Sequence, residues 1–394
     1  MAGITGLGTT YNLPNYTGLL YGLTPEVTPF FSAIGGLSGG GQTTATSFEW
    51  ETYDLRDASQ PAIVEGATAP TASGRARANV SNVAQIHQEK VSISYSKQAA
   101  TGLKAGINNA DTNPVGNELN WQVQQMLKQM VRDIEYSFIR GVYQAPANNS
   151  TGRKTRGIIA AVSSNSWDQK GAALPTVTAT ASTNKVNSAS HGLANGDSVI
   201  FTALTGGDGL STSVAYFVVN KGTNDFEVSN TKGGAAIDIT VDASAATAYK
   251  LTALTTGFID DALQGVYDNG GITSTTTLIL NSSQKRAISA AYGAAYAKAS
   301  PIVGQVGGVN VTRIETDFGL VNIMLNAFVP KHQIVIASLE QCKPVFLETP
   351  GKGHFFAEPL AKTGASDDVQ LYGEVGLAYG NEKAHGLISG LALA

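Results

Sequence analysis

Residues 113–144, NPVGNELNWQVQQMLKQMVRDIEYSFIRGVYQ, decide how the rest of this chain is organised. Apolar residues recur in this stretch at steps of three and four, which is the spacing of one face of an α-helix. They are Leu119, Val123, Leu127, Met130, Ile134, Phe138 and Val142. Arg132 and Glu135 fall mostly on other faces, and Pro114 and Gly141 suit the two ends of a helix. The pattern predicts an amphipathic helix about 45 Å long, a spine across an extended subunit.

The composition favours contacts with other proteins over contacts with nucleic acid or lipid. Among 394 residues there are 26 Lys and Arg and 30 Asp and Glu, which gives a net charge of −4. This balance provides no general attraction to DNA or to an anionic membrane. Charged residues make up 14% of the chain, against about 25% in an average globular protein. The length predicts about two or three domains. We find no signal-peptide pattern and no apolar run of membrane-spanning length, so we expect a product made in a cytoplasm.

Residues 1–35 are rich in aromatic residues and proline and carry very few charges. Such a segment cannot form a core alone, and its apolar side chains are unfavourable in water. We therefore expect an N-terminal arm that packs on a neighbouring subunit or along the predicted helix. Phe30, Phe31 and Ile34 are its candidate contact residues.

Residues 36–100 predict a long hairpin. Two alternating runs, one around Trp50 and one that follows Arg77, flank about 25 residues of turn-rich sequence. Two strands alone are marginally stable, so the hairpin needs a neighbouring surface. Arg75 and Arg77 near its tip are either ordinary solubilising charges or partners for carboxylates on a neighbour.

Three further regions follow. Residues 101–173 contain the predicted spine helix. Residues 174–253 consist of short apolar runs separated by Gly, Asn, Asp and Ser, which predicts a small all-β module inserted into the chain. Residues 254–394 mix helical and strand patterns, as is typical of an α/β domain, and end in an alternating stretch that we expect to return to an earlier sheet. Within this region, residues 332–348 predict one apolar strand.

No constellation in the sequence predicts catalysis, a metal site or a cofactor. Adjacent carboxylates do not face each other on a helix or strand, the five histidines lack metal-ligand spacing, and one cysteine allows no disulfide within the chain. We expect Cys342 to be a buried thiol and residues 350–353 to be a turn rather than a phosphate loop. The carboxylate pairs are Asp260–Asp261 and Asp367–Asp368, and the histidines are His87, His191, His332, His354 and His385.

Short motifs in a fixed order cover nearly the whole chain outside the β module. They are TPEVTPFFSAIG (24–35), EW (49–50), VEG (64–66), RDIE (132–135), TRGI (155–158), DFG (317–319), LAKTG (360–364), and GE with NEKAHG (373–374 and 381–386). With these motifs the chain resembles the major capsid proteins of tailed bacteriophages, the Hong Kong 97-type fold family. Residues 191–201, HGLANGDSVIF, resemble more loosely the small β modules of phage virion proteins.

The resemblance implies an α+β, Hong Kong 97-type major capsid fold with an inserted small all-β domain. The N-terminal arm would be residues 1–35 and the extended loop (E-loop) hairpin residues 36–100. The peripheral (P) domain would be residues 101–173 with the spine helix at 113–144, the inserted β domain residues 174–253, and the axial (A) domain residues 254–394 with late strands returning to the P domain. Candidate contacts between subunits are Phe30, Phe31, Ile34, Trp50, Glu65, Arg75, Arg77, Arg132 and Glu135.

The resemblance further implies a structural protein, not an enzyme, that self-assembles into hexamers and pentamers of an icosahedral head. The head would enclose double-stranded DNA without sequence-specific binding. Besides itself, the implied partners are a portal, a decoration protein and a separate scaffolding protein, the last because no helical scaffolding segment precedes the arm. The protein would be made in the bacterial host cytoplasm and reside in the virion, with no cofactor and no membrane. The alternative is a virion decoration protein that binds a receptor or carbohydrate, as the β module suggests.

One departure from the family concerns covalent links between subunits. The self-crosslinking branch joins a loop lysine to a neighbour's asparagine, but no lysine lies between Trp50 and Gln88. We therefore expect a shell without covalent crosslinks.

Overall fold

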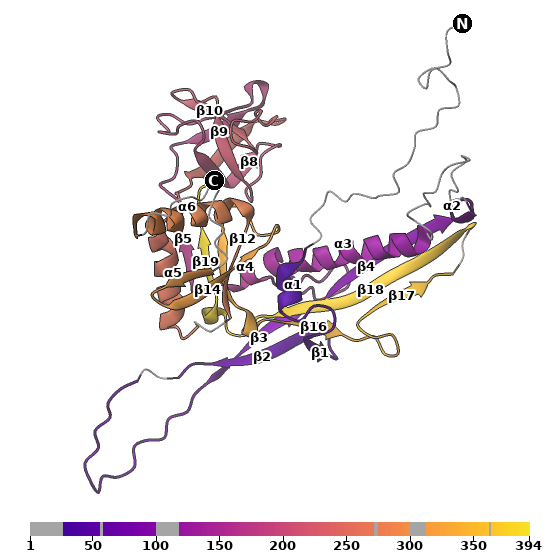
Figure 1. Cartoon of the computed structure of the whole chain (residues 1–394), viewed down its shortest axis with the longest axis vertical. Helices are drawn as coiled ribbons and strands as arrows, with labels where there is room; N and C mark the ends of the chain where they lie inside the picture. Colours follow the sequence, from indigo (N-terminus) through magenta and orange to yellow (C-terminus); the bar gives the residue numbers. More distant parts are fainter. Residues whose placement is uncertain (1–26, 56–57, 100–117, 272–274, 300–312, 362–363) are drawn as a thin grey trace.

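The computed structural model describes residues 27–55, 58–99, 118–271, 275–299, 313–361 and 364–394. A long helix lies along long strands, and an α/β unit lies at one end of them (Figure 1). A small barrel and a thin hairpin project from that end in opposite directions. Most of the predicted arm and the predicted start of the spine helix lie outside the described residues.

The spine helix, α3, spans Glu118–Arg140. Met130, Ile134 and Phe138 are buried, in line with the apolar spacing. The first part of the predicted stripe, at Leu119, Val123 and Leu127, is only half-buried.

The end of the spine helix differs from the prediction, because the helix stops at Arg140 and Val142 is 71% exposed. Gly141 explains the difference. A Cβ atom there would lie 2.3 Å from the carbonyl oxygen of Ser137 and 2.4 Å from that of Thr155. The chain therefore turns away at this close approach of two backbone segments.

The spine helix packs on a five-stranded sheet that collects strands from distant parts of the chain (Figure 1). The strand order is β1, β16, β18, β17, and β4 pairs with β18. The strands are β1 (Gly41–Thr43), β4 (Gln85–Ser94), β16 (Lys343–Leu347), β17 (Phe355–Pro359) and β18 (Ser366–Ala378). The late strand β18 thus lies antiparallel to β4, from Ser366 opposite Ser94 to Val375 opposite Gln85. A short helix, α2 (Tyr95–Ala99), follows β4.

The hairpin is shorter than the predicted region 36–100. It consists of β2 (Ser47–Tyr53) and β3 (Arg77–Val83), whereas β1 and β4 belong to the larger sheet. The alternation breaks at the end of β3, because Asn82, Val83 and Ala84 are all buried, at 0%, 2% and 0% exposed. Three buried neighbours in succession mark the point where the chain passes from one sheet to the other.

Residues 177–250 form a closed barrel of strands in the order β10, β7, β6, β11, β8, β9. The strands are β6 (Val177–Thr180), β7 (Lys185–Asn187), β8 (Ser198–Gly206), β9 (Ala215–Val219), β10 (Asp225–Ser229) and β11 (Ala243–Lys250). The barrel has its own core, in which Phe201 and Phe226 are fully buried. The sequence predicted its all-β character, although the apolar stretch at residues 236–241 is irregular and not a strand.

The chain enters and leaves the barrel at neighbouring points. Ala173 pairs with Tyr249 in an antiparallel bridge. The barrel also contacts the C-terminal tail, since the amide of Leu393 donates a hydrogen bond to Ser198 Oγ at 3.1 Å. A small apolar cluster joins the two, made of Ile200, Ala215, Phe217, Leu251 and Leu393.

The α/β unit is built on a six-stranded sheet in the order β13, β14, β12, β15, β19, β5. The strands are β5 (Ser166–Asp168), β12 (Thr276–Leu280), β13 (Arg313–Thr316), β14 (Gly319–Leu325), β15 (Ile334–Ser338) and β19 (Gly386–Ser389). The helices of this region are α5 (Thr256–Asp268) and α6 (Ser282–Ala299), while the short helix α4 (Ile158–Ala161) packs on the spine helix. The single strand predicted in residues 332–348 is in fact β15 and β16, which lie in different sheets because a 3₁₀ turn at Leu339–Gln341 separates them.

Candidate assembly surfaces

The base of the hairpin is held firmly against the body of the chain. Trp50 donates a hydrogen bond from Nε1 to the carbonyl oxygen of Gly380 at 2.7 Å, and its ring meets Tyr379 edge-to-face at 5.0 Å. Lys383 forms an ion pair with Asp54 at 2.9 Å, at the end of β2. Trp50 is therefore engaged within its own chain, and it sets the direction in which the hairpin projects.

The tip of the hairpin, described at residue 55 and residues 58–76, presents apolar side chains to solvent. Leu55 is 76% exposed, Ile63 64% and Val64 79%. Glu65, which follows Val64 in the chain, and Arg75 are also exposed. Large apolar side chains left uncovered on a thin projection are the kind of surface that another protein covers.

Arg77, at the start of β3, has a partner in its own hairpin. Its Nη1 lies 2.6 Å from Glu51 Oε2, with both side chains largely exposed. Exposed pairs of this kind contribute about 0–1 kcal/mol. Arg77 is thus not a strong anchor inside the chain, and a carboxylate of a neighbour could replace Glu51 at little cost.

The described end of the arm is tied to the spine helix by Glu135. Helix α1 spans Pro29–Ala33. The amides of Phe30 and Phe31 donate to the two carboxylate oxygens of Glu135 at 2.9 and 2.7 Å, and Asn326 Nδ2 donates to the same group. Glu135 is fully buried, and burial raises the pKa of its carboxyl group while the three hydrogen bonds oppose that shift. The carboxylate therefore caps the N-terminus of α1, because it accepts hydrogen bonds from two backbone amides of the first turn that would otherwise be unpaired.

This arrangement corrects the predicted place of Glu135, which the helical spacing put on a polar face. It also locates the arm residues: Phe30 is 0% exposed, Phe31 1% and Ile34 7%, all in the core cluster that includes α3. The ring of Phe31 meets that of Phe138 edge-to-face at 5.7 Å. In this part the arm packs along the spine helix of its own chain, so these side chains leave almost no surface for a neighbour.

Arg132 lies on the same helix but is only partly buried. Its Nη1 donates to Gln129 at 2.7 Å, and its guanidinium lies 5.9 Å from the centre of the Phe328 ring. It forms no ion pair among the described residues, so its charge remains available for a contact outside the chain.

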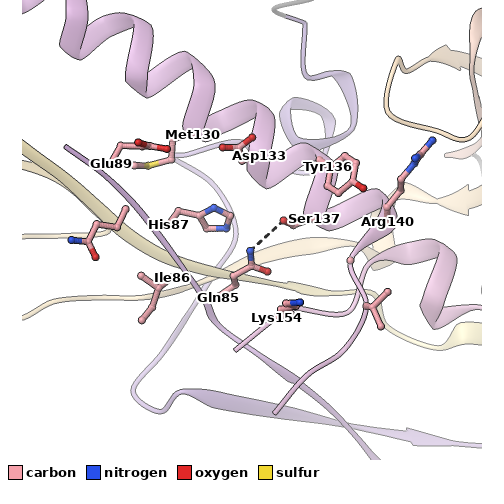
Figure 2. Close-up of a pocket in the computed structure, with 13 residues that line it drawn as sticks. Gln85, Ile86, His87, Glu89, Met130, Asp133, Tyr136, Ser137, Arg140 and Lys154 are labelled. Carbon is pink, nitrogen blue, oxygen red and sulfur yellow. Dashed lines mark hydrogen bonds between the residues drawn. The ribbon is translucent and has the colours of Figure 1, made fainter. Parts of the chain in front are cut away.

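A groove of about 560 Å³ separates β4 from the second half of the spine helix (Figure 2). His87 lies on the β4 side and is 6% exposed, and burial lowers the pKa of its imidazole to about 4. The imidazole is therefore neutral at pH 7. Glu89 lies at one end of the groove and Arg140 at the other, with Asp133 and Lys154 between them. A groove with one basic end and one acidic end suits a protein segment better than a small uncharged ligand.

Two reactive groups that the sequence singled out, Cys342 and Asp368, are held by their own surroundings. Cys342 is free and buried, and burial raises the pKa of its thiol to about 12. Asp368 is held by Lys90 at 2.7 Å and by Ser92, which lowers the pKa of its carboxyl group to about 2. In the described part of the chain, no three His, Cys, Asp or Glu side chains are placed to hold a metal ion.

Comparison with known families decides the identity of the chain, because the family model described as SU10 major capsid protein matches residues 3–392. The chain belongs to this family. No curated protein matches it. Among solved structures, the Cyanophage A-1(L) capsid asymmetric unit is similar with a TM-score of 0.52 and 10% identity, over 98% of this chain and 99% of that chain. The capsid structure of the Cyanophage P-SCSP1u has a TM-score of 0.50 and 10% identity, over 98% of both chains.

This major capsid protein has the Hong Kong 97-type fold of phage capsids, as the resemblance implied. It is a structural component of the virion and not an enzyme. None of the helices that the structure describes is long and apolar enough to cross a membrane.

Sequence reasoning missed two residues that shape these surfaces. Asn326 follows β14 directly and completes the Glu135 site, 191 positions away along the chain. His87 occupies a buried position of β4, between exposed neighbours at Ile86 and Gln88. The only signal for it was the alternation of that strand, which put it on the same face as the apolar residues that follow.

Proposed function

We propose that copies of this major capsid protein form the hexamers and pentamers of an icosahedral head that encloses double-stranded DNA. The observation that carries the proposal is the hairpin tip, where Leu55, Ile63 and Val64 are each more than 60% exposed. A firmly held base with an uncovered apolar tip is what a contact between subunits requires. We assign the E-loop to this hairpin and infer that a neighbouring copy covers its tip.

Charge supports the same proposal. Glu65, Arg75 and Arg132 are accessible on the chain, with no ion pair for any of them in the described part. We propose them as contacts between subunits, because single charges at the rim of an interface fix its register. The net charge of −4 fits a shell that surrounds DNA without binding it tightly.

We further assign the P domain to the spine helix with its five-stranded sheet and the A domain to the α/β unit. We propose that the barrel is an insertion and projects from the outer side of the head. Its adjacent ends and its own core support this assignment. A scaffolding protein, a portal and a decoration protein are proposed as further partners, on the resemblance to the family.

Assembly of the purified chain tests the proposal. We expect shells by negative-stain electron microscopy and a fast-sedimenting species by ultracentrifugation. The double variant Ile63→Ser and Val64→Ser should lose both while the subunit stays folded by circular dichroism. The matched control replaces Val214 and Val241, two exposed valines of the barrel, by serine and should still assemble. Normal shells from the tip variant would refute the role of the loop.

A further inference from the structure

A second cleft, of about 460 Å³, lies where the barrel, the α/β unit and the end of the spine helix meet. Its volume falls in the range of small-molecule sites, about 300–1,000 Å³. The barrel contributes Thr212 and Ser213, the α/β unit His332 and Gln333, and the spine helix Tyr136 and Arg140. The barrel, which contacts the C-terminal tail through Leu393, contributes one side of the cleft.

Arg140 supplies a cation without a carboxylate partner in the described part of the chain. Its guanidinium lies 5.8 Å from the centre of the Tyr136 ring, and its Nε is buried without a hydrogen-bond acceptor. The other charges of the cleft, Asp168 and Lys170, neutralise each other in an ion pair of 2.7 Å. A planar guanidinium held against a ring is suited to a carboxylate, which it can bind through two parallel hydrogen bonds.

The α/β unit lines the cleft with two neutral hydrogen-bonding side chains, Gln333 and His332. Gln333 has a buried Oε1 without a donor, and it lines the cleft. His332 is 6% exposed and makes no side-chain hydrogen bond to the described residues. Burial and then the charge of Arg140 lower the pKa of its imidazole to about 4, so the ring is neutral at pH 7 and can donate and accept. These groups suit a ligand with hydroxyl groups, because a hydroxyl can donate to Gln333 and also exchange hydrogen bonds with His332.

The barrel side adds the hydroxyls of Thr212 and Ser213, and Tyr136 adds a ring that is 48% exposed. We propose that the cleft binds an acidic sugar, a hydroxylated ring that carries a carboxylate. The carboxylate binds Arg140, the ring hydroxyls bind Gln333 and His332, and one face of the sugar ring packs on Tyr136. Binding of a sugar at this site would be a function separate from shell assembly. The barrel would contribute to it together with the α/β unit and the spine helix, because the cleft is lined by residues of all three.

Titration calorimetry on the purified full-length chain tests the site with sodium glucuronate as the probe. Glucose has the hydroxyls without the carboxylate, and acetate has the carboxylate without the hydroxyls. We expect glucuronate to bind with a saturable isotherm and both controls to bind at least about tenfold more weakly, the loss expected for one charge-assisted contact or its equivalent. No saturable binding of glucuronate, or equal binding of acetate, would overturn the proposal.

Two variants locate the site. Arg140→Gln should weaken glucuronate binding about tenfold or more. Arg313→Gln removes an exposed arginine of β13 away from the cleft and should bind as the unaltered chain does. Hydrogen exchange of the unaltered chain provides a measurement that needs no variant. Glucuronate should protect residues 211–214 and 330–334, and protection elsewhere with none in these segments would place the site wrongly.

Discussion

Replacing Glu135 by glutamine tests how the arm is joined to the spine helix. The Glu135 carboxylate accepts hydrogen bonds from the amides of Phe30 and Phe31 and from the side chain of Asn326. Glutamine keeps one acceptor oxygen and gains an NH₂ group. In Glu135→Gln, at least one of the three buried donors therefore loses its acceptor and faces another donor.

Two effects set the magnitude of this change. A hydrogen bond to a charged group contributes about 1.5–3 kcal/mol. Burial acts in the opposite direction, because the raised pKa of Glu135 shows that the site disfavours the charge itself. We expect a net loss of about 1–2 kcal/mol in the free energy of unfolding at pH 7.

Urea unfolding of unassembled subunits, followed by circular dichroism, measures the loss, and hydrogen exchange locates it. Residues 28–37 should lose protection in Glu135→Gln, because α1 is held by this carboxylate. The control is Glu315→Gln, an exposed glutamate of β13, which should change the free energy of unfolding by less than about 0.5 kcal/mol. Unchanged stability, or a loss that leaves α1 fully protected, would refute the reasoning.

Four further outcomes are expected. Ile134→Ala should lower the free energy of unfolding in urea by about 2–5 kcal/mol, because Ile134 is fully buried. Leu127→Ala should lower it less, because Leu127 is half-buried. Equal losses would show that the buried face of the helix is assigned wrongly. Burial lowers the pKa values of His87 and His332 from 6.5 to about 4. Between pH 6.5 and pH 4 the unfolded chain therefore binds more protons at these histidines than the folded chain does. The free energy of unfolding should fall by about 3 kcal/mol for each histidine as the pH decreases over this range. A flat stability profile over that interval, measured by urea midpoints, would contradict this. Replacing residues 174–248 by a short Gly-Ser linker should leave shells that lack the barrel in electron micrographs, and failure of that chain to fold would argue against an insertion. Shells should dissociate into single chains on a denaturing gel without reductant, because the one cysteine is buried and the loop has no lysine; a ladder of oligomers would show otherwise.

The sequence predicted well what depends on local periodicity. The spacing of Met130, Ile134 and Phe138 gave the buried face of the spine helix, and the alternation in residues 366–378 gave a strand. Turn residues between short apolar runs also predicted an all-β module. These signals are local, because helices and strands each repeat along one face.

Contacts between distant parts of the chain could not be predicted in the same way. Glu135 looks solvated in the sequence because its hydrogen-bond donors, Phe30 and Phe31, lie 105 and 104 positions away. The apolar run in residues 332–348 gave no sign of division, since both halves are buried and only a turn at Leu339–Gln341 sends them to different sheets. The cleft around Arg140 depends on how the barrel is attached, which no local pattern records.

The pairing of Ala173 with Tyr249 has a practical consequence. Residues facing each other across an antiparallel pair have Cα atoms about 4.5–5.5 Å apart. A folded module whose own termini are equally close could be grafted there without stretching the flanking strands. The same junction could carry an enzyme or an antigen, so that a shell of many copies would display it in a regular array.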